Sequence, residues 1–154
     1  MICEYCGVKT IKPTTCQDIY NQLAFYTLNE ADPVFFIHQL IVDAYAGQHA
    51  KTTDKPIKIA FALIGLYLFS EKGYTGKEVQ NAHMQLANME RGNFWPSFKK
   101  PHGKASMNVG DVLSVKAGKN RDEAIKKWAT SVWLLYSEAR PDVINLLSEV
   151  KFKY

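Results

Sequence analysis

Residues 32–49, with the sequence DPVFFIHQLIVDAYAGQH, constrain the fold of this chain more than any other stretch. Asp32 suits a helix N-cap and Pro33 suits the first helical position, so the stretch predicts a helix that runs to about residue 48. An ordinary core helix does not need so many polar side chains on and beside its apolar face. The helix is therefore expected to serve both the core and a functional site. Its polar residues of interest are His38, Asp43, Tyr45, Gln48 and His49.

Helical periodicity recurs along the chain, and no stretch of the sequence shows convincing strand alternation. A length of 154 residues fits one domain with a sizeable core. We therefore expect an all-α fold, a single-domain bundle of about five or six helices over residues 1–154, with neighbours antiparallel where connections are short. Residues 1–13 are expected to form a short zinc-knuckle segment packed on this bundle.

Local signals predict where several helices begin and end. Capping boxes are expected where Thr15 precedes Asp18 and where Thr75 precedes Glu78. The nearly all-apolar third helix is expected to begin at a cap formed by Asp54 and to end before a glycine at residue 73. The fourth helix is expected to run to about residue 91, and a later helix to span residues 121–139 after an N-cap at residue 120.

Composition and charge exclude some classes of protein and leave others open. The chain is 47% hydrophobic and 22% charged, as globular proteins usually are, and its net charge of +4 is spread without a basic block. Nucleic-acid binding is therefore not indicated. The sequence has no secretory signal, and its longest apolar run, residues 59–69, is far shorter than the roughly 20 residues that span a bilayer. We expect a cytoplasmic protein whose partner is a small molecule or a protein.

The N-terminus carries a metal-binding pattern, Cys3-Glu4-Tyr5-Cys6-Gly7. Two thiolates separated by two residues can bind one tetrahedral Zn²⁺, and the glycine after them permits a sharp turn. Thioredoxin-like redox sites share this spacing, but they follow a strand, for which Met1-Ile2 leaves no room. The remaining alternative is a pair of inert thiols near a frayed chain end.

Two further zinc ligands are predicted from the antiparallel arrangement of the first two helices. Cys16 lies in the first turn of the first helix, beside which the end of the second helix should lie. His38 and His49 are eleven residues apart, roughly 16 Å along a helix, so they cannot bind the same ion. We therefore predict a zinc site made of Cys3, Cys6, Cys16 and His49. Alternatively, Cys16 is a buried small residue and His49 a solvated histidine at a helix C-terminus.

A second set of polar residues, His38, Asp43, Tyr45 and His83, needs a separate explanation. His38 and Asp43 lie about 140° apart around their helix, so these two residues cannot pair with each other within it, and a joint site would need a residue from another helix. His83 lies on the inner face of the fourth helix and is the best candidate to approach His38. These residues are weak candidates for a catalytic metal site, and a structural, hydrogen-bonded histidine is the alternative for His38.

Residues 92–107, GNFWPSFKKPHGKASM, break the helical pattern with two prolines and two glycines. Long loops in compact domains tend to be functional or disordered. The aromatic residues Phe94, Trp95 and Phe98 indicate that this loop packs back on the bundle. The sequence does not determine whether it moves.

Over nearly its whole length, the chain resembles an uncharacterised, mainly bacterial family, domain of unknown function 5946. The most specific part is residues 38–49, HQLIVDAYAGQH, beside the CEYCG opening and Cys16, with support from residues 109–112 and 128–133. Members often carry a histidine between the knuckle and the third cysteine, and another in the third helix where this chain has Ala62. If the second histidine belongs to an active centre, this protein has lost it. Because the family has no assigned activity, the resemblance supports the site placement and implies no reaction.

Three functions are consistent with the sequence. The first is a small helical protein whose structural zinc ties the N-terminus to the first helical hairpin. The second is a metal-dependent enzyme with His38, Asp43 and His83, together with Tyr45, around an ion inside the bundle. The third is a thiol-based redox sensor that uses the three cysteines.

Overall fold

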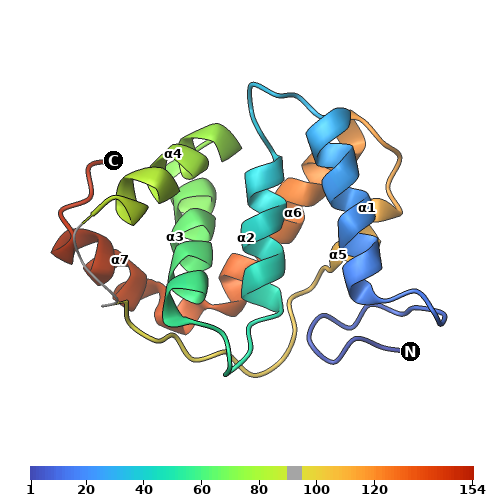
Figure 1. Cartoon of the computed structure of the whole chain (residues 1–154), viewed down its shortest axis with the longest axis horizontal. Helices are drawn as coiled ribbons and strands as arrows, with labels where there is room; N and C mark the ends of the chain where they lie inside the picture. Colours follow the sequence, from blue (N-terminus) through green and yellow to red (C-terminus); the bar gives the residue numbers. More distant parts are fainter. Residues whose placement is uncertain (90–94) are drawn as a thin grey trace.

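The structure is a computed structural model that describes residues 1–89 and 95–154 (Figure 1). Within these residues the fold is all-α, as predicted, with seven α-helices and one short 3-10 helix rather than five or six helices in total. In chain order the elements are α1 (Cys16–Asn29), α2 (His38–Gln48), α3 (Pro56–Lys72), α4 (Gly76–Ala87), α5 (Val109–Leu113), α6 (Lys119–Leu135), η1 (Ser137–Ala139) and α7 (Arg140–Glu149).

The predicted capping boxes are both present. Thr15 caps α1 and exchanges hydrogen bonds with Asp18, and Thr75 caps α4 in the same way with Glu78. Helix α3 ends at Gly73, whose φ of 71° is the left-handed conformation that glycine adopts without strain. The local sequence therefore determines where these helices begin or end.

The predicted start of α2 is wrong, because residues 33–37 form turns and the helix begins only at His38. Asp32 accepts a hydrogen bond from the Val34 amide, but the turn that it caps does not continue into the helix. Phe36 adopts a left-handed φ of 57°, which interrupts helical propagation. The start of α4 packs directly on this turn, since a Cβ added at Gly76 would lie 1.8 Å from the Phe36 carbonyl oxygen.

Three other predicted helix ends differ from the structure. The N-cap of α3 is Lys55, and Asp54 instead accepts from the Lys51 amide. The N-cap of α6 is Gly118 rather than residue 120, and the helix ends at Leu135 before the 3-10 turn instead of running to residue 139. The predicted end of the fourth helix near residue 91 lies outside the described residues, and α4 itself ends at Ala87.

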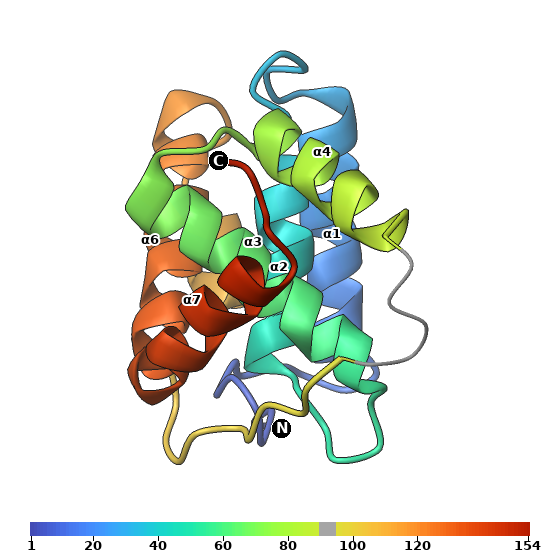
Figure 2. The same cartoon turned by 90° about the vertical axis from the view of Figure 1, so that its left-hand side faces the viewer.

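Helix α3 contributes more buried residues than any other described helix and packs against α2, α4, α6 and α7. In Figure 2, α4 and α7 lie toward the viewer and α1 lies behind them. Polar bonds also join α2 to α6 within the core: Trp128 donates to the Gln48 side chain at 2.9 Å, and the Tyr136 hydroxyl donates to the Gly47 carbonyl at 2.7 Å. Gln48 is fully buried and also donates to the Met107 carbonyl at 2.8 Å. These bonds fix the axial position of α2 relative to α6.

Trp95 and Phe98, two of the three aromatic residues in the loop after α4, pack on the bundle as predicted. Trp95 is buried and meets the edge of Phe61 at a centroid distance of 5.0 Å, and Phe98 packs against the core. Phe94, the third aromatic residue, lies outside the described residues. No helix within residues 1–89 and 95–154 combines the length and the apolar character that a membrane crossing demands.

Candidate metal centre

The N-terminal residues form a tight hairpin that folds back on itself at Gly7. Ile2 and Lys9 form an isolated antiparallel bridge, and the Cys3 amide donates to the Val8 carbonyl at 2.9 Å. Gly7 has a φ of 81°, and its amide donates to the Cys3 carbonyl at 2.9 Å. The sharp turn predicted at Gly7 is therefore present, and it brings the side chains of Cys3 and Cys6 close together.

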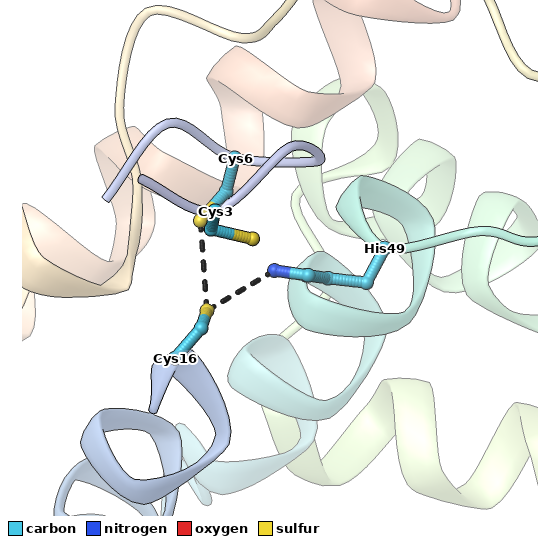
Figure 3. A group of neighbouring side chains, drawn as sticks. All are labelled: Cys3, Cys6, Cys16 and His49. Atoms are coloured by element: carbon cyan, nitrogen blue, oxygen red, sulfur yellow. Dashed lines mark hydrogen bonds between the residues drawn. The ribbon is translucent and has the colours of Figure 1, made fainter. Parts of the chain in front are cut away.

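Helices α1 and α2 bring two more potential ligands to this hairpin (Figure 3). Cys16 is the first residue of α1, and His49 is the C-cap of α2. Cys16 Sγ lies 3.6 Å from Cys6 Sγ and 3.3 Å from His49 Nε2. One ligand atom from each of Cys3, Cys6, Cys16 and His49 lies within 4.8 Å of the other three. The structure thus brings together the four residues predicted to bind zinc.

Two distances between these atoms are close to those of a tetrahedral metal site. With Zn–S bonds of about 2.3 Å and Zn–N bonds of about 2.05 Å, the edges of a tetrahedron are about 3.8 Å between sulfurs and about 3.6 Å between sulfur and nitrogen. The observed distances of 3.6 Å from Cys6 to Cys16 and 3.3 Å from Cys16 to His49 are close to these values. The cluster could therefore hold a metal ion with small side-chain movements.

The orientation of His49 also suits metal binding. Its backbone amide and its Nδ1 both lie 2.9 Å from the Tyr45 carbonyl oxygen. Because a carbonyl only accepts hydrogen bonds, Nδ1 must carry a proton, and in a neutral imidazole the lone pair is then on Nε2, which faces Cys16. The Tyr45 ring stacks on His49 at a centroid distance of 3.9 Å, and its hydroxyl donates to Cys16 Sγ at 3.6 Å.

The thiols of Cys6 and Cys16 differ in their tendency to ionise. Their mutual hydrogen bond raises the pKa of Cys6, with burial adding to the effect. The same hydrogen bond lowers the pKa of Cys16 to about 4, helped by the neighbouring His49 ring and by the hydrogen bond from the Tyr45 hydroxyl. Without a metal ion, Cys16 is therefore the thiolate of this pair, and a bound ion would hold both sulfurs as thiolates.

A cavity of about 490 Å³ opens beside the cluster. Cys3, Cys16 and His49 contribute to its walls, whereas Cys6, whose exposed fraction is 3%, does not line it. Tyr45 and Lys58 lie on other parts of the wall. The four potential ligands are therefore not equally accessible from solvent.

The second set of predicted residues does not form one cluster. His38 Nδ1 lies 2.9 Å from the Thr27 hydroxyl on α1. This contact is the one expected if His38 is a structural, hydrogen-bonded histidine. Asp43 is buried and instead pairs with His83, whose Nε2 lies 3.1 Å from Asp43 Oδ2. Tyr45 belongs to the cysteine cluster. Across residues 1–89 and 95–154, the three-cysteine and histidine group is the only set of three or more His, Cys, Asp or Glu residues close enough to hold a metal ion.

The pair of Asp43 and His83 depends on two residues that sequence reasoning missed. Gln39, one helical turn before Asp43, donates to its other carboxylate oxygen at 3.2 Å. Gly65 on α3 leaves the space that the pair occupies, since a Cβ added there would lie 1.9 Å from Asp43 Oδ2 and 2.9 Å from His83 Nε2. The spacing of four residues could have indicated Gln39 as a partner, whereas Gly65 carried no local signal.

Replacing His83 by leucine is expected to destabilise the protein in a pH-dependent way. Burial raises the pKa of Asp43, and His83 and Gln39 oppose this shift, so the pKa rises further when His83 is absent. A carboxyl group with a raised folded-state pKa opposes folding as the pH rises through that pKa. We expect a loss of about 3–5 kcal/mol in the free energy of unfolding near pH 8. The loss should be smaller near pH 5.

Urea denaturation of the His83→Leu variant at the two pH values measures this effect. The exposed His102 provides the matched control, and His102→Leu should change stability by less than about 0.5 kcal/mol. An equal loss at both pH values would show that packing, rather than the unpaired carboxylate, accounts for the effect.

The fold and the cluster define a class of all-helical proteins in which an N-terminal Cys-x-x-Cys hairpin meets a helical hairpin at a three-cysteine, one-histidine group. The chain belongs to the family of unknown function DUF5946, whose sequence pattern matches residues 1–137. No curated protein and no solved structure matches the chain. The family assignment agrees with the resemblance noted from the sequence.

Proposed function

We propose that Cys3, Cys6, Cys16 and His49 bind a structural Zn²⁺ that ties the N-terminal hairpin to α1 and α2. The observation that supports this proposal is the convergence of four ligand atoms from three separate segments within 4.8 Å. A set of three sulfurs and one imidazole nitrogen favours tetrahedral zinc over Mg²⁺ or Ca²⁺, because those two ions prefer oxygen ligands. The hydrogen bond from His49 Nδ1 to the Tyr45 carbonyl is the usual outer-shell contact of a zinc-binding histidine.

Four protein ligands favour a structural role over a catalytic one. A tetrahedral ion with four protein ligands has no open position for water or substrate, so it cannot polarise a substrate or activate a water molecule. The ion would instead hold the hairpin in place. Met1 and Ile2 are exposed, so they do not anchor the start of the chain by burial in the core. The second hypothesis, a catalytic ion shared by His38, Asp43 and His83, has no support from the contacts of His38.

The zinc centre would carry one net negative charge, from three thiolates, a neutral imidazole and a divalent ion. Two lysine side chains of the opposite charge lie near the N-terminal hairpin. Tyr5 lies between the first two cysteines in the hairpin. The ammonium groups of Lys51 and Lys100 lie 5.7 Å and 4.2 Å from the centroid of its ring. Reduced thiols at such a centre suit a reducing compartment such as the cytoplasm.

Metal analysis together with thermal melting tests this proposal. Protein purified without added metal should contain one equivalent of zinc per chain. A strong chelator should remove the zinc and lower the melting temperature, and added Zn²⁺ should restore it. Absence of bound zinc, or an unchanged melting temperature after its removal, would rule out a structural zinc centre.

A further inference from the structure

The three sulfurs of this centre differ in their access to the adjacent cavity, and this difference suggests how the centre could be oxidised. We propose that Cys16 is a modification site for hydroperoxides, reached through the adjacent cavity, and that its oxidation leads to a disulfide with Cys6 and release of the ion. This inference rests on the proposed zinc centre. It adds an oxidised state of the protein, in which the zinc ion no longer joins the N-terminal hairpin to α1 and α2.

Access to the sulfurs supports Cys16 as the site of attack. Cys16 lines the cavity of about 490 Å³, whereas Cys6 is buried behind it. A cavity of this volume admits a hydroperoxide easily. The Tyr45 hydroxyl donates a hydrogen bond to Cys16 Sγ at 3.6 Å, which stabilises the thiolate that would attack the peroxide.

The distance between the sulfurs supports Cys6 as the second partner. The Sγ atoms of Cys6 and Cys16 lie 3.6 Å apart, so a movement of roughly 1.5 Å brings them to the disulfide bond length of about 2.05 Å. Cys6 lies in the hairpin that turns at Gly7 and Cys16 is the first residue of α1, so the bond would join two separate chain segments. Cys3 also lines the cavity, and a disulfide that includes it is the competing outcome.

The reaction has two balanced steps. The Cys16 thiolate attacks the outer peroxide oxygen, a sulfur–oxygen bond forms, and the peroxide O–O bond breaks with release of alkoxide or hydroxide. The Cys6 thiolate then attacks the sulfenic sulfur of Cys16, which forms the disulfide and releases hydroxide. The two thiolates lose two electrons and the hydroperoxide gains them. Only Cys3 and His49 then remain as ligands, and two ligands do not hold zinc tightly.

Hydrogen peroxide added to the zinc-loaded full-length protein tests the proposal. A chromogenic chelator should report one zinc released per chain, and peptide mass mapping should find one disulfide, between Cys6 and Cys16. A thiol reductant followed by Zn²⁺ should restore the original state. Retention of zinc, a disulfide that includes Cys3, or release without any disulfide would each overturn the proposal. Protein that lacks zinc before peroxide is added would overturn the zinc centre itself, so the two failures are distinguishable.

The route to Cys16 is tested by narrowing the cavity. Ala46 lines it on α2 and is not among the four ligands. The Ala46→Phe variant should bind zinc as before and release it several-fold more slowly under peroxide. Leu134→Phe, at an exposed residue of α6 away from the cavity, is the control and should match the unmodified protein. Equal release rates for the two variants would overturn access through this cavity.

Discussion

The Cys16→Ser variant is expected to lose its zinc and to be markedly less stable than the unmodified protein. A serine hydroxyl replaces the thiolate that contacts both Cys6 and His49, and it is a poor zinc ligand. If free zinc stands about 1,000-fold above its dissociation constant, binding stabilises the folded state by about 4 kcal/mol. Loss of that contribution should lower the melting temperature by roughly 10 °C for a chain of this size. Calorimetry with metal analysis of the same samples measures both effects.

A chelator separates the metal from the packing of the side chain. When zinc is removed from both proteins, Cys16→Ser and the unmodified protein should melt at nearly the same temperature. This is expected because serine and cysteine differ little in size and Cys16 is only partly buried. A variant that remains much less stable in chelator would show that Cys16 contributes through packing, and it would remove the support for a structural metal.

The Gly65→Ala variant is expected to be the other strongly destabilised protein, although alanine normally stabilises a helix relative to glycine by about 1 kcal/mol. The new Cβ would lie 1.9 Å from Asp43 Oδ2 and 2.9 Å from His83 Nε2, where no atom fits. To relieve the overlap, Asp43 must leave its pairing with His83 inside the core. Separating a buried pair costs about 3–5 kcal/mol, and we expect the free energy of unfolding to fall by that amount.

Two comparisons identify the cause of that loss. Gly47 in α2 is also a glycine within a helix, but a Cβ there would meet Val132 Cγ1 at 3.2 Å, a methyl group that can move slightly. Gly47→Ala should therefore change stability by no more than about 1 kcal/mol. In an Asp43→Ala background the overlap with the carboxylate is absent and only the 2.9 Å approach to His83 Nε2 remains, so Gly65→Ala should cost much less. An unchanged cost in that background would mean that Asp43 is not what the new methyl group displaces.

Local sequence determined much of this fold because helix caps and apolar periodicity act over a few residues. The capping boxes at Thr15 and Thr75 and the glycine that ends α3 were all correctly predicted. The start of α2 was not, because the left-handed turn at Phe36 is packed against the first residue of α4, forty residues further along. A contact of that kind leaves no mark in the local pattern.

At the candidate functional residues, too, the sequence predicted one part and tertiary packing decided the other. The Cys-x-x-Cys pattern, the position of Cys16 in its helix and the antiparallel hairpin are enough to gather four ligands, because helix geometry fixes which ends meet. Whether His38 or His83 lies beside Asp43 depends on how three helices rotate about their axes. That rotation is fixed by the packing of the whole core, including the space that Gly65 leaves on α3. The sequence by itself therefore determined the helices and the cysteine cluster, and only the tertiary structure decided the buried pair of Asp43 and His83.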